Sequence, residues 1–116
     1  MDDIDWVDFL FKFDGRINRG KFWLGVAILY VVPWLLFLIA AAVNSSFLWV
    51  LVSLVVLVSL WPGLAISIKR WHDRDKSGWW ILISLIPLVG PIWALVETGF
   101  LPGTPGQNQY GPDPLS

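Results

Sequence analysis

The chain has 116 residues, of which 56% are hydrophobic and 15% are charged, with a formal net charge of −1 and no cysteine. This hydrophobicity excludes a disordered chain, and the charge lacks the basic excess that nucleic-acid binding needs. The lack of cysteine excludes disulfides, thiolate nucleophiles and sulfur metal ligands. The length predicts a single domain, 1–116, and nine tryptophans are typical of a protein with membrane interfaces.

Residues 1–21 form the mixed segment before the first apolar run. Asp2 or Asp3 is placed to cap a short helix over 4–13. Three charged residues fall within a narrow arc of that helix: Asp5, Asp8 and Lys12. The pattern predicts either a helix lying in the membrane interface with its apolar side down, or a helix packed on the other segments.

Two apolar runs follow, 22–43 and 47–68, and each has 22 residues without a charge. As a helix each would reach about 33 Å, against a hydrocarbon core of about 30 Å. Pro33 is predicted to kink the first run, and Pro62-Gly63 to weaken the last third of the second. These lengths predict an all-α integral membrane protein with an uncleaved first span.

A third apolar run, 79–96, is interrupted by Pro87, Gly90 and Pro91. It is predicted to cross as a broken span, which its length favours, or to enter and return with its turn at 87–91. The tail, 97–116, is rich in glycine and proline, so we expect an extended, turn-rich segment that is loose or pinned against the domain.

The basic residues lie in two groups only. Four precede the first span and four lie between the second and third: Lys12, Arg16, Arg19 and Lys21, then Lys69, Arg70, Arg74 and Lys76. Two spans separate the groups, so both lie on the same side. The positive-inside rule predicts that this side, with the N-terminus, is cytoplasmic.

The stretch 69–80 carries the residues that chemistry would use. His72, Asp73 and Asp75 could ligate a metal, but no second histidine or cysteine exists, so we expect neither metal nor cofactor and read them as ion-pair partners in a compact interfacial loop. His72 could have one of two roles. It could carry a proton, or, as we favour, its imidazole could hydrogen-bond to Asp73 or to a backbone carbonyl. Ser77 matches no catalytic motif and is predicted to cap a new helix, so we expect no enzyme.

The eight basic residues allow two interpretations. They bind anionic lipid head groups, or they only set the topology. The first two spans contain no acidic or basic residue, which argues against a monomeric transporter or proton channel.

Four motifs occur in order along the chain. They are Gly15-Arg16 with Arg19 and Phe22-Trp23; Arg70, His72-Asp73 and Ser77-Gly78-Trp79-Trp80; Pro87 and Gly90; and Gly103, Gly106, Asn108 and Tyr110-Gly111-Pro112-Asp113-Pro114. In this order they resemble a family of small bacterial inner-membrane proteins known as domain of unknown function 805. Trp71 and Asp75 stand where that family usually has leucine and glycine. The resemblance implies a bacterial inner-membrane location and brings no established activity.

The sequence therefore predicts a non-enzymatic, multi-pass membrane protein that binds lipid head groups or a larger membrane partner. The predicted cytoplasmic cluster comprises Arg16, Arg19, Arg70, His72, Asp73 and Ser77. The alternative is an oligomeric transporter or channel subunit, with a path lined by serines of the second span, Pro62-Gly63 and 87–91. The expected partners are membrane lipids, a membrane protein or further copies of the chain.

Overall fold

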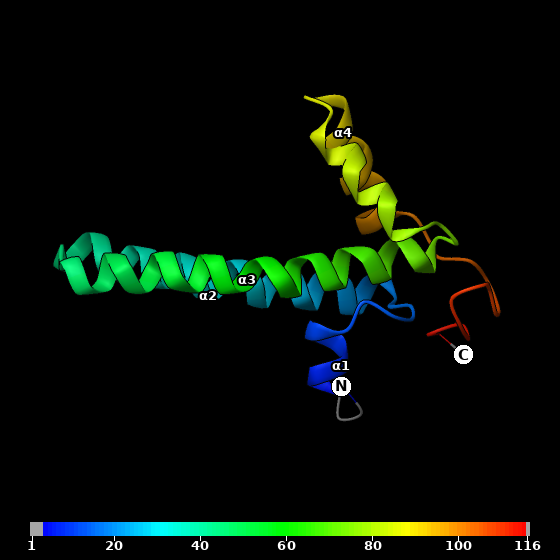
Figure 1. Cartoon of the computed structure of the whole chain (residues 1–116), viewed down its shortest axis with the longest axis horizontal. Coiled ribbons are helices and arrows are strands. Elements are labelled where there is room, and N and C mark those ends of the chain that lie inside the picture. The colour runs from blue at the N-terminus through cyan, green and yellow to red at the C-terminus, as the bar shows by residue number, and fades with distance from the viewer. Residues whose placement is uncertain (1–3, 116) are drawn as a thin grey trace.

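The structure, a computed structural model, describes residues 4–115 and is helical, with no strand among those residues (Figure 1). In chain order the elements are α1 (Trp6–Phe11), α2 (Arg19–Val43), α3 (Ser46–Asp73), the 3-10 helix η1 (Gly78–Leu85), α4 (Val89–Leu95) and the π-helix η2 (Val96–Phe100). The remaining tail is turn-rich and contains one isolated bridge between Asn108 and Gly111.

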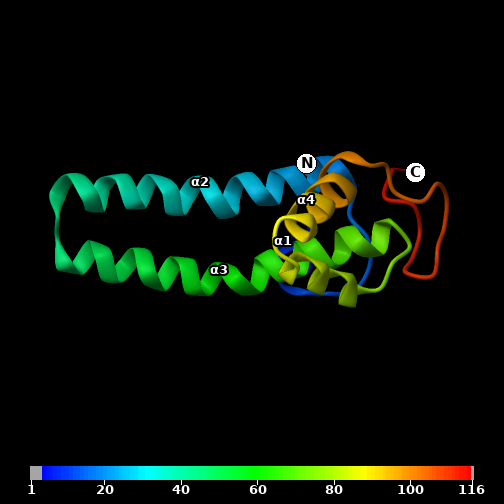
Figure 2. The same ribbon diagram turned by 90° about the horizontal axis from the view of Figure 1, so that it is seen from above.

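Helices α2 and α3 run side by side along the 50 Å length of the molecule, and both are long and apolar enough to cross a membrane (Figure 2). Only 6% and 17% of their most apolar 18-residue windows are buried. A core helix of a water-soluble protein would be buried over most of such a window, so this pair suits an apolar solvent. The two predicted spans are confirmed as helices, and both continue through Pro33 and Pro62.

Both helices are longer than the apolar runs. Asn18 caps α2 by accepting the Lys21 backbone N–H at 2.8 Å, so α2 begins at Arg19. Helix α3 continues five residues beyond the predicted end at Ile68, to Asp73. The prediction of a loop from residue 69 onward is therefore wrong for its first five residues. We call the end of the pair with Arg19 and Asp73 the basic end, and the end with Asn44 the far end.

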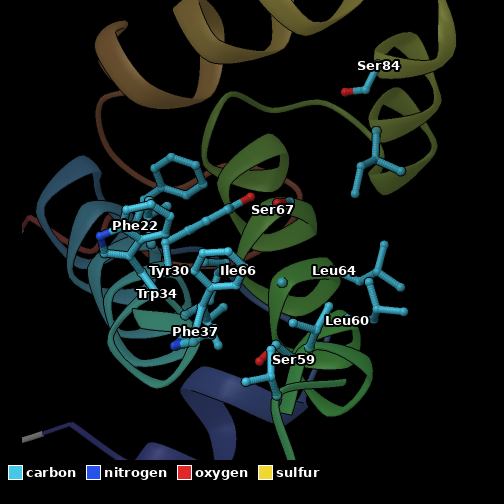
Figure 3. Close-up of a pocket in the computed structure, with 17 residues that line it drawn as sticks. Phe22, Tyr30, Trp34, Phe37, Ser59, Leu60, Leu64, Ile66, Ser67 and Ser84 are labelled. Carbon is cyan, nitrogen blue, oxygen red and sulfur yellow. The ribbon is translucent and has the colours of Figure 1, made fainter. Parts of the chain in front are cut away.

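The two helices touch closely near their ends. Ala40 is fully buried near the far end, and Phe22, Gly25 and Ile66 are buried near the basic end. A Cβ on Gly25 would lie 3.0 Å from Ile66, so glycine allows this close approach. Between these contacts lies a groove of about 830 Å³, bordered by both helices with Ser84 of η1 at its edge (Figure 3).

Helix α1 packs on α3 through Phe9, which is 4% exposed. Its N-cap is Asp5, which accepts from two backbone N–H groups. Asp2 and Asp3, which we expected to cap it, lie outside the described residues, and the helix is shorter than 4–13. The Trp61 indole donates to the last carbonyl of α1, that of Phe11, at 2.8 Å. The packed arrangement is the one observed, while the interfacial position stays a prediction.

The third apolar run folds back on itself. Helices η1 and α4 lie side by side and project sideways from the basic end (Figure 1). The turn includes Leu88, which has a φ of 65°, and a Cβ on Gly90 would lie 1.8 Å from the Ile83 carbonyl oxygen, so only glycine fits there. The η1 arm reaches roughly 16 Å, and the second arm continues without a break from α4 into η2. The turn at 87–91 is observed, and the position of this hairpin relative to the membrane stays a prediction.

Candidate functional site

Asp73, in the last turn of α3, binds two buried arginines. One carboxylate oxygen lies 2.5 Å from Arg70 Nη1, three residues earlier on the same helix. The other lies 3.0 Å from Arg16 Nε and 2.9 Å from Arg16 Nη2. The three side chains are only 0% to 4% exposed. We call Arg16, Arg70 and Asp73 the Arg–Asp–Arg cluster.

The two arginines also hold the tail. Arg16 donates to the backbone carbonyls of Thr104, Gly106 and Gly111 at 2.5, 2.7 and 3.2 Å. Arg70 donates to the carbonyl of Thr98 at 2.6 Å and to that of Leu101. The tail has little regular structure in which to pair these carbonyls, so the arginines take the place of a helix or sheet partner. The tail is therefore pinned against the domain.

Close packing seals the contact between the tail and the cluster. A Cβ on Gly103 would lie 2.0 Å from a carboxylate oxygen of Asp73, so only glycine fits at that position. The Thr104 backbone N–H donates to the Asp73 carbonyl at 2.7 Å. The tail thus crosses directly over the end of α3.

His72 joins the N-terminal segment to the tail. Its Nδ1 lies 2.9 Å from the carbonyl oxygen of Gly15, and its ring stacks on Tyr110 with centroids 3.9 Å apart and planes 3° apart. Asn108 donates to the His72 carbonyl at 2.9 Å. The backbone-bonded imidazole that the sequence favoured is observed, and its carbonyl partner is on Gly15.

Glu97 fastens the base of the η1–α4 hairpin. Its carboxylate lies 2.5 Å from Lys76 Nζ and 3.4 Å from Arg74 Nε, and it accepts the Trp93 indole N–H at 2.9 Å. Burial raises the pKa of Glu97, but the hydrogen bonds from Lys76 and Trp93 and the nearby positive charges lower it further than burial raises it. The pKa therefore lies below its usual range, and Glu97 is ionised at neutral pH. Lys76 also lies over the Trp80 ring at 4.6 Å.

Two further cations bind backbone carbonyls of other segments. Lys69, 1% exposed, donates to the carbonyls of Asp8 and Phe9 and so satisfies the open end of α1. Arg19 Nη1 donates to the Phe100 carbonyl at 2.7 Å, but Arg19 is itself exposed. The basic end is thus held together largely by cations on carbonyl oxygens.

This arrangement defines what the site can do. Arg16 makes four hydrogen bonds and one further ion-pair contact, all to the chain itself, and its side chain is 1% exposed, so it is not available to a lipid phosphate. Arg70 is fully buried. The head-group role predicted for these two arginines therefore does not fit the structure, because their donors bind the chain itself. Only the exposed Arg19 among the predicted arginines remains at the surface.

The other predicted residues have structural contacts. Ser77 caps η1 by accepting the Trp79 N–H at 3.2 Å, as expected from its position before the tryptophans. His72 and Asp73 point to different partners, and within residues 4–115 no three potential ligands gather into a metal site. The arrangement holds separate segments of the chain together.

Sequence reasoning missed several members of this site. Gly103 and Tyr110 were seen only as parts of a motif, and Lys69 and Glu97 were not included in the predicted cluster. Glu97 had a usable signal, since it is the only carboxylate between Asp75 and Asp113. Backbone carbonyl partners, in contrast, cannot be predicted from residue types, because every residue has a carbonyl.

Two long apolar helices with ionisable residues gathered at one end define a small helical membrane protein. The chain belongs to the family described as Protein of unknown function (DUF805), which matches residues 10–112. It is 30% identical to Inner membrane protein YhaH of Escherichia coli (strain K12) over 122 residues, covering 96% of this chain and 97% of the relative.

Other relatives agree with this family assignment. Inner membrane protein YhaI of the same strain is 34% identical over 103 residues, covering 88% of this chain and 85% of the relative. Uncharacterized protein YiiR is 30% identical over 129 residues, covering 90% and 86%. No solved structure matches the chain. The predicted family membership is confirmed.

Proposed function

We propose that this is a non-enzymatic protein of the bacterial inner membrane that binds anionic lipid head groups at its basic end. In this proposal α2 and α3 cross the bilayer and the basic end faces the cytoplasm. The relatives' names support the inner-membrane location, and the eight basic residues at one end support the cytoplasmic orientation.

The observation that carries the proposal is the division of the cations into two sets. Arg16, Arg70 and Lys69 are buried and bind carbonyls or carboxylates of the chain. Arg19 is exposed and Lys21 is partly exposed, and both lie in the first turn of α2. Each exposed cation near an anionic surface contributes about 1 kcal/mol of attraction. The buried set builds the end of the protein, and the exposed set is left to meet head groups.

The transport alternative has no comparable support. The hydroxyls of Ser53 and Ser59 donate to carbonyls of their own helix at 3.0 and 2.8 Å. The groove between α2 and α3 is bordered mainly by aromatic and aliphatic side chains, among them Phe22 and Trp34 (Figure 3). Such a lining suits a lipid chain or a helix better than a hydrated solute.

The test compares two variants that change the net charge equally. Arg19→Gln/Lys21→Gln removes two positive charges from the start of α2, and Gln107→Glu/Gln109→Glu adds two negative charges to the exposed tail. Native mass spectrometry from nanodiscs would measure retention of phosphatidylglycerol relative to phosphatidylcholine. We expect a loss of roughly 30-fold in the first variant, from two contributions of about 1 kcal/mol. Equal losses in both variants, or none in the first, would refute head-group binding.

A further inference from the structure

Two segments leave the α2–α3 pair on opposite sides of the basic end: α1 on one side and the η1–α4 hairpin on the other (Figure 1). We call these segments the two wings. They extend along the second dimension of the molecule, which measures 37 Å, against a thickness of 19 Å. The far end consists of α2 and α3 alone, so the protein is wide at one end only (Figure 2).

The contacts of α1 fix its depth along α3. It touches α3 from Trp61, whose indole binds the Phe11 carbonyl, to Lys69, whose amine binds the Asp8 and Phe9 carbonyls. These positions lie about 22 Å and about 34 Å along the helix from Ser46. A hydrocarbon core of about 30 Å that begins at Ser46 would end between them. With the core placed in this way, the α1 wing would lie at the level of the membrane interface.

The hairpin lies at the same level. Gly78, at its start, packs on Ile68, and Trp80 stacks on Trp71 with centroids 5.9 Å apart. Ile81 and Ser84 border the groove together with residues of α3 that lie further from the basic end. The hairpin thus starts beside the last turns of α3 and reaches back toward the apolar half of the pair.

Both wings expose apolar side chains. The hairpin keeps its charges at its base, whereas the α1 wing also carries the exposed charged side chains of Asp5 and Asp8. Residues 78–96 contain no charged residue, and the hairpin's largest exposed fractions are 78% for Trp79, 77% for Leu85 and 80% for Leu88. On α1, Val7 is 61% exposed. The ion pairs of the hairpin lie where it joins α3, at Lys76 and Glu97. Ile81 of the hairpin borders the same groove as Leu60 and Leu64 of α3, so a lipid that covers the helix pair would also reach the hairpin.

We propose that the two wings embed in the head-group boundary of a single leaflet, which makes the protein a one-sided wedge that favours membranes convex on that leaflet. In the far leaflet two helices of about 10 Å diameter occupy roughly 160 Å². At the basic end the molecule spans up to 37 by 19 Å. The extra area expands one leaflet only. The inference rests on the proposed crossing of α2 and α3, but not on head-group binding or on which face is cytoplasmic.

The first test measures depth. The chain has no cysteine, so single nitroxide labels can be placed without altering the background. Wing labels at Val7→Cys and Leu85→Cys would be compared with a mid-span label at Leu57→Cys and an aqueous label at Gln107→Cys, using oxygen and a water-soluble nickel chelate as collision partners in liposomes.

We expect both wing labels at depths between the two references, within roughly 5–10 Å of the head-group boundary. Three results would overturn the wedge. The wing labels could be as accessible to the nickel chelate as the label at residue 107, they could lie as deep as the label at residue 57, or another protein could shield them from both reagents. A label at Leu57 that is open to nickel would instead overturn the crossing on which the wedge rests.

The second test measures curvature preference. An impermeant fluorophore added outside the vesicles labels the Gln107→Cys protein only in molecules whose basic end faces outward. It labels the Ser46→Cys protein only in molecules whose basic end faces inward. On membrane tubes pulled from giant vesicles, we expect the first population to be enriched on the tube relative to the vesicle and the second to be depleted. Equal tube-to-vesicle ratios for the two orientations, or the reverse order, would overturn the proposal. This comparison does not need a variant that alters the wings, so misfolding of such a variant cannot explain the result.

Discussion

Replacing Asp73 with asparagine should release the tail from the basic end. The carboxylate accepts three charge-assisted contacts, at 2.5, 2.9 and 3.0 Å, from side chains that are almost completely buried. Asparagine keeps one oxygen but turns an NH₂ group toward a guanidinium, and it leaves Arg16 and Arg70 without a counter-charge. Breaking a buried ion pair in this way costs about 3–5 kcal/mol. That loss would raise the open population of the tail by roughly 100-fold or more.

Hydrogen exchange of the Thr104 amide measures this opening directly, because its N–H donates to the Asp73 carbonyl and is protected only while the tail is docked. Asp75→Asn is the matched control: it makes the same chemical change two residues away at an exposed position. We expect Thr104 protection to fall at least about 100-fold in Asp73→Asn and to stay near the wild-type value in the control. Similar protection in both variants would show that the Arg–Asp–Arg cluster does not hold the tail.

Gly103→Ala should loosen the tail to a similar extent, since the new Cβ would lie 2.0 Å from the Asp73 carboxylate; tail proteolysis in detergent would measure it. Tyr110→Leu should lose the ring stack on His72 and shift the imidazole proton resonances in NMR spectra of a nanodisc sample. Glu97 has a lowered folded-state pKa, so its contribution to stability is present above its unfolded pKa and is lost as pH falls through the folded value. The unfolding free energy of the wild type relative to Glu97→Gln should therefore stay constant from about pH 7 to pH 5 and fall below about pH 4.

Each of these predictions has a control. Gly63→Ala adds a Cβ where nothing lies within 4 Å, and it should leave proteolysis unchanged. Tyr110→Phe keeps the ring and should keep the His72 resonances near their wild-type positions. A difference between wild type and Glu97→Gln that already falls between pH 7 and pH 5 would mean that the folded pKa is not lowered.

The spanning helices were predictable because their signal is local. An uncharged run of 22 residues predicts both a helix and its apolar surroundings. Helices α2 and α3 contain the predicted ranges with a few residues added at their ends. The meeting of the two basic groups at one end also followed from counting two spans. The Arg16–Asp73 pair, separated by 57 positions in the chain, lies where that count placed it.

The roles of the charged residues were not predictable in the same way. Charge next to an apolar run indicates a membrane boundary, but it does not say whether a guanidinium faces lipid or a buried carbonyl. Arg16 and Arg70 are buried because a tail without regular structure supplies acceptors, and any residue type provides a carbonyl. The hairpin in the third run was harder to predict for a related reason: it depends on a close contact at Gly90, which the length of the run does not show.

The contacts of Arg16 join residues up to 95 positions apart. During synthesis its three contacts with tail carbonyls cannot all form until the segment around Gly111 has left the ribosome and docked. A polypeptide stopped before Thr104 would carry a guanidinium with one carboxylate and none of its three tail carbonyls. Such a product would have a loose, protease-accessible end, so the cell's proteases would have a physical mark by which to recognise an unfinished copy.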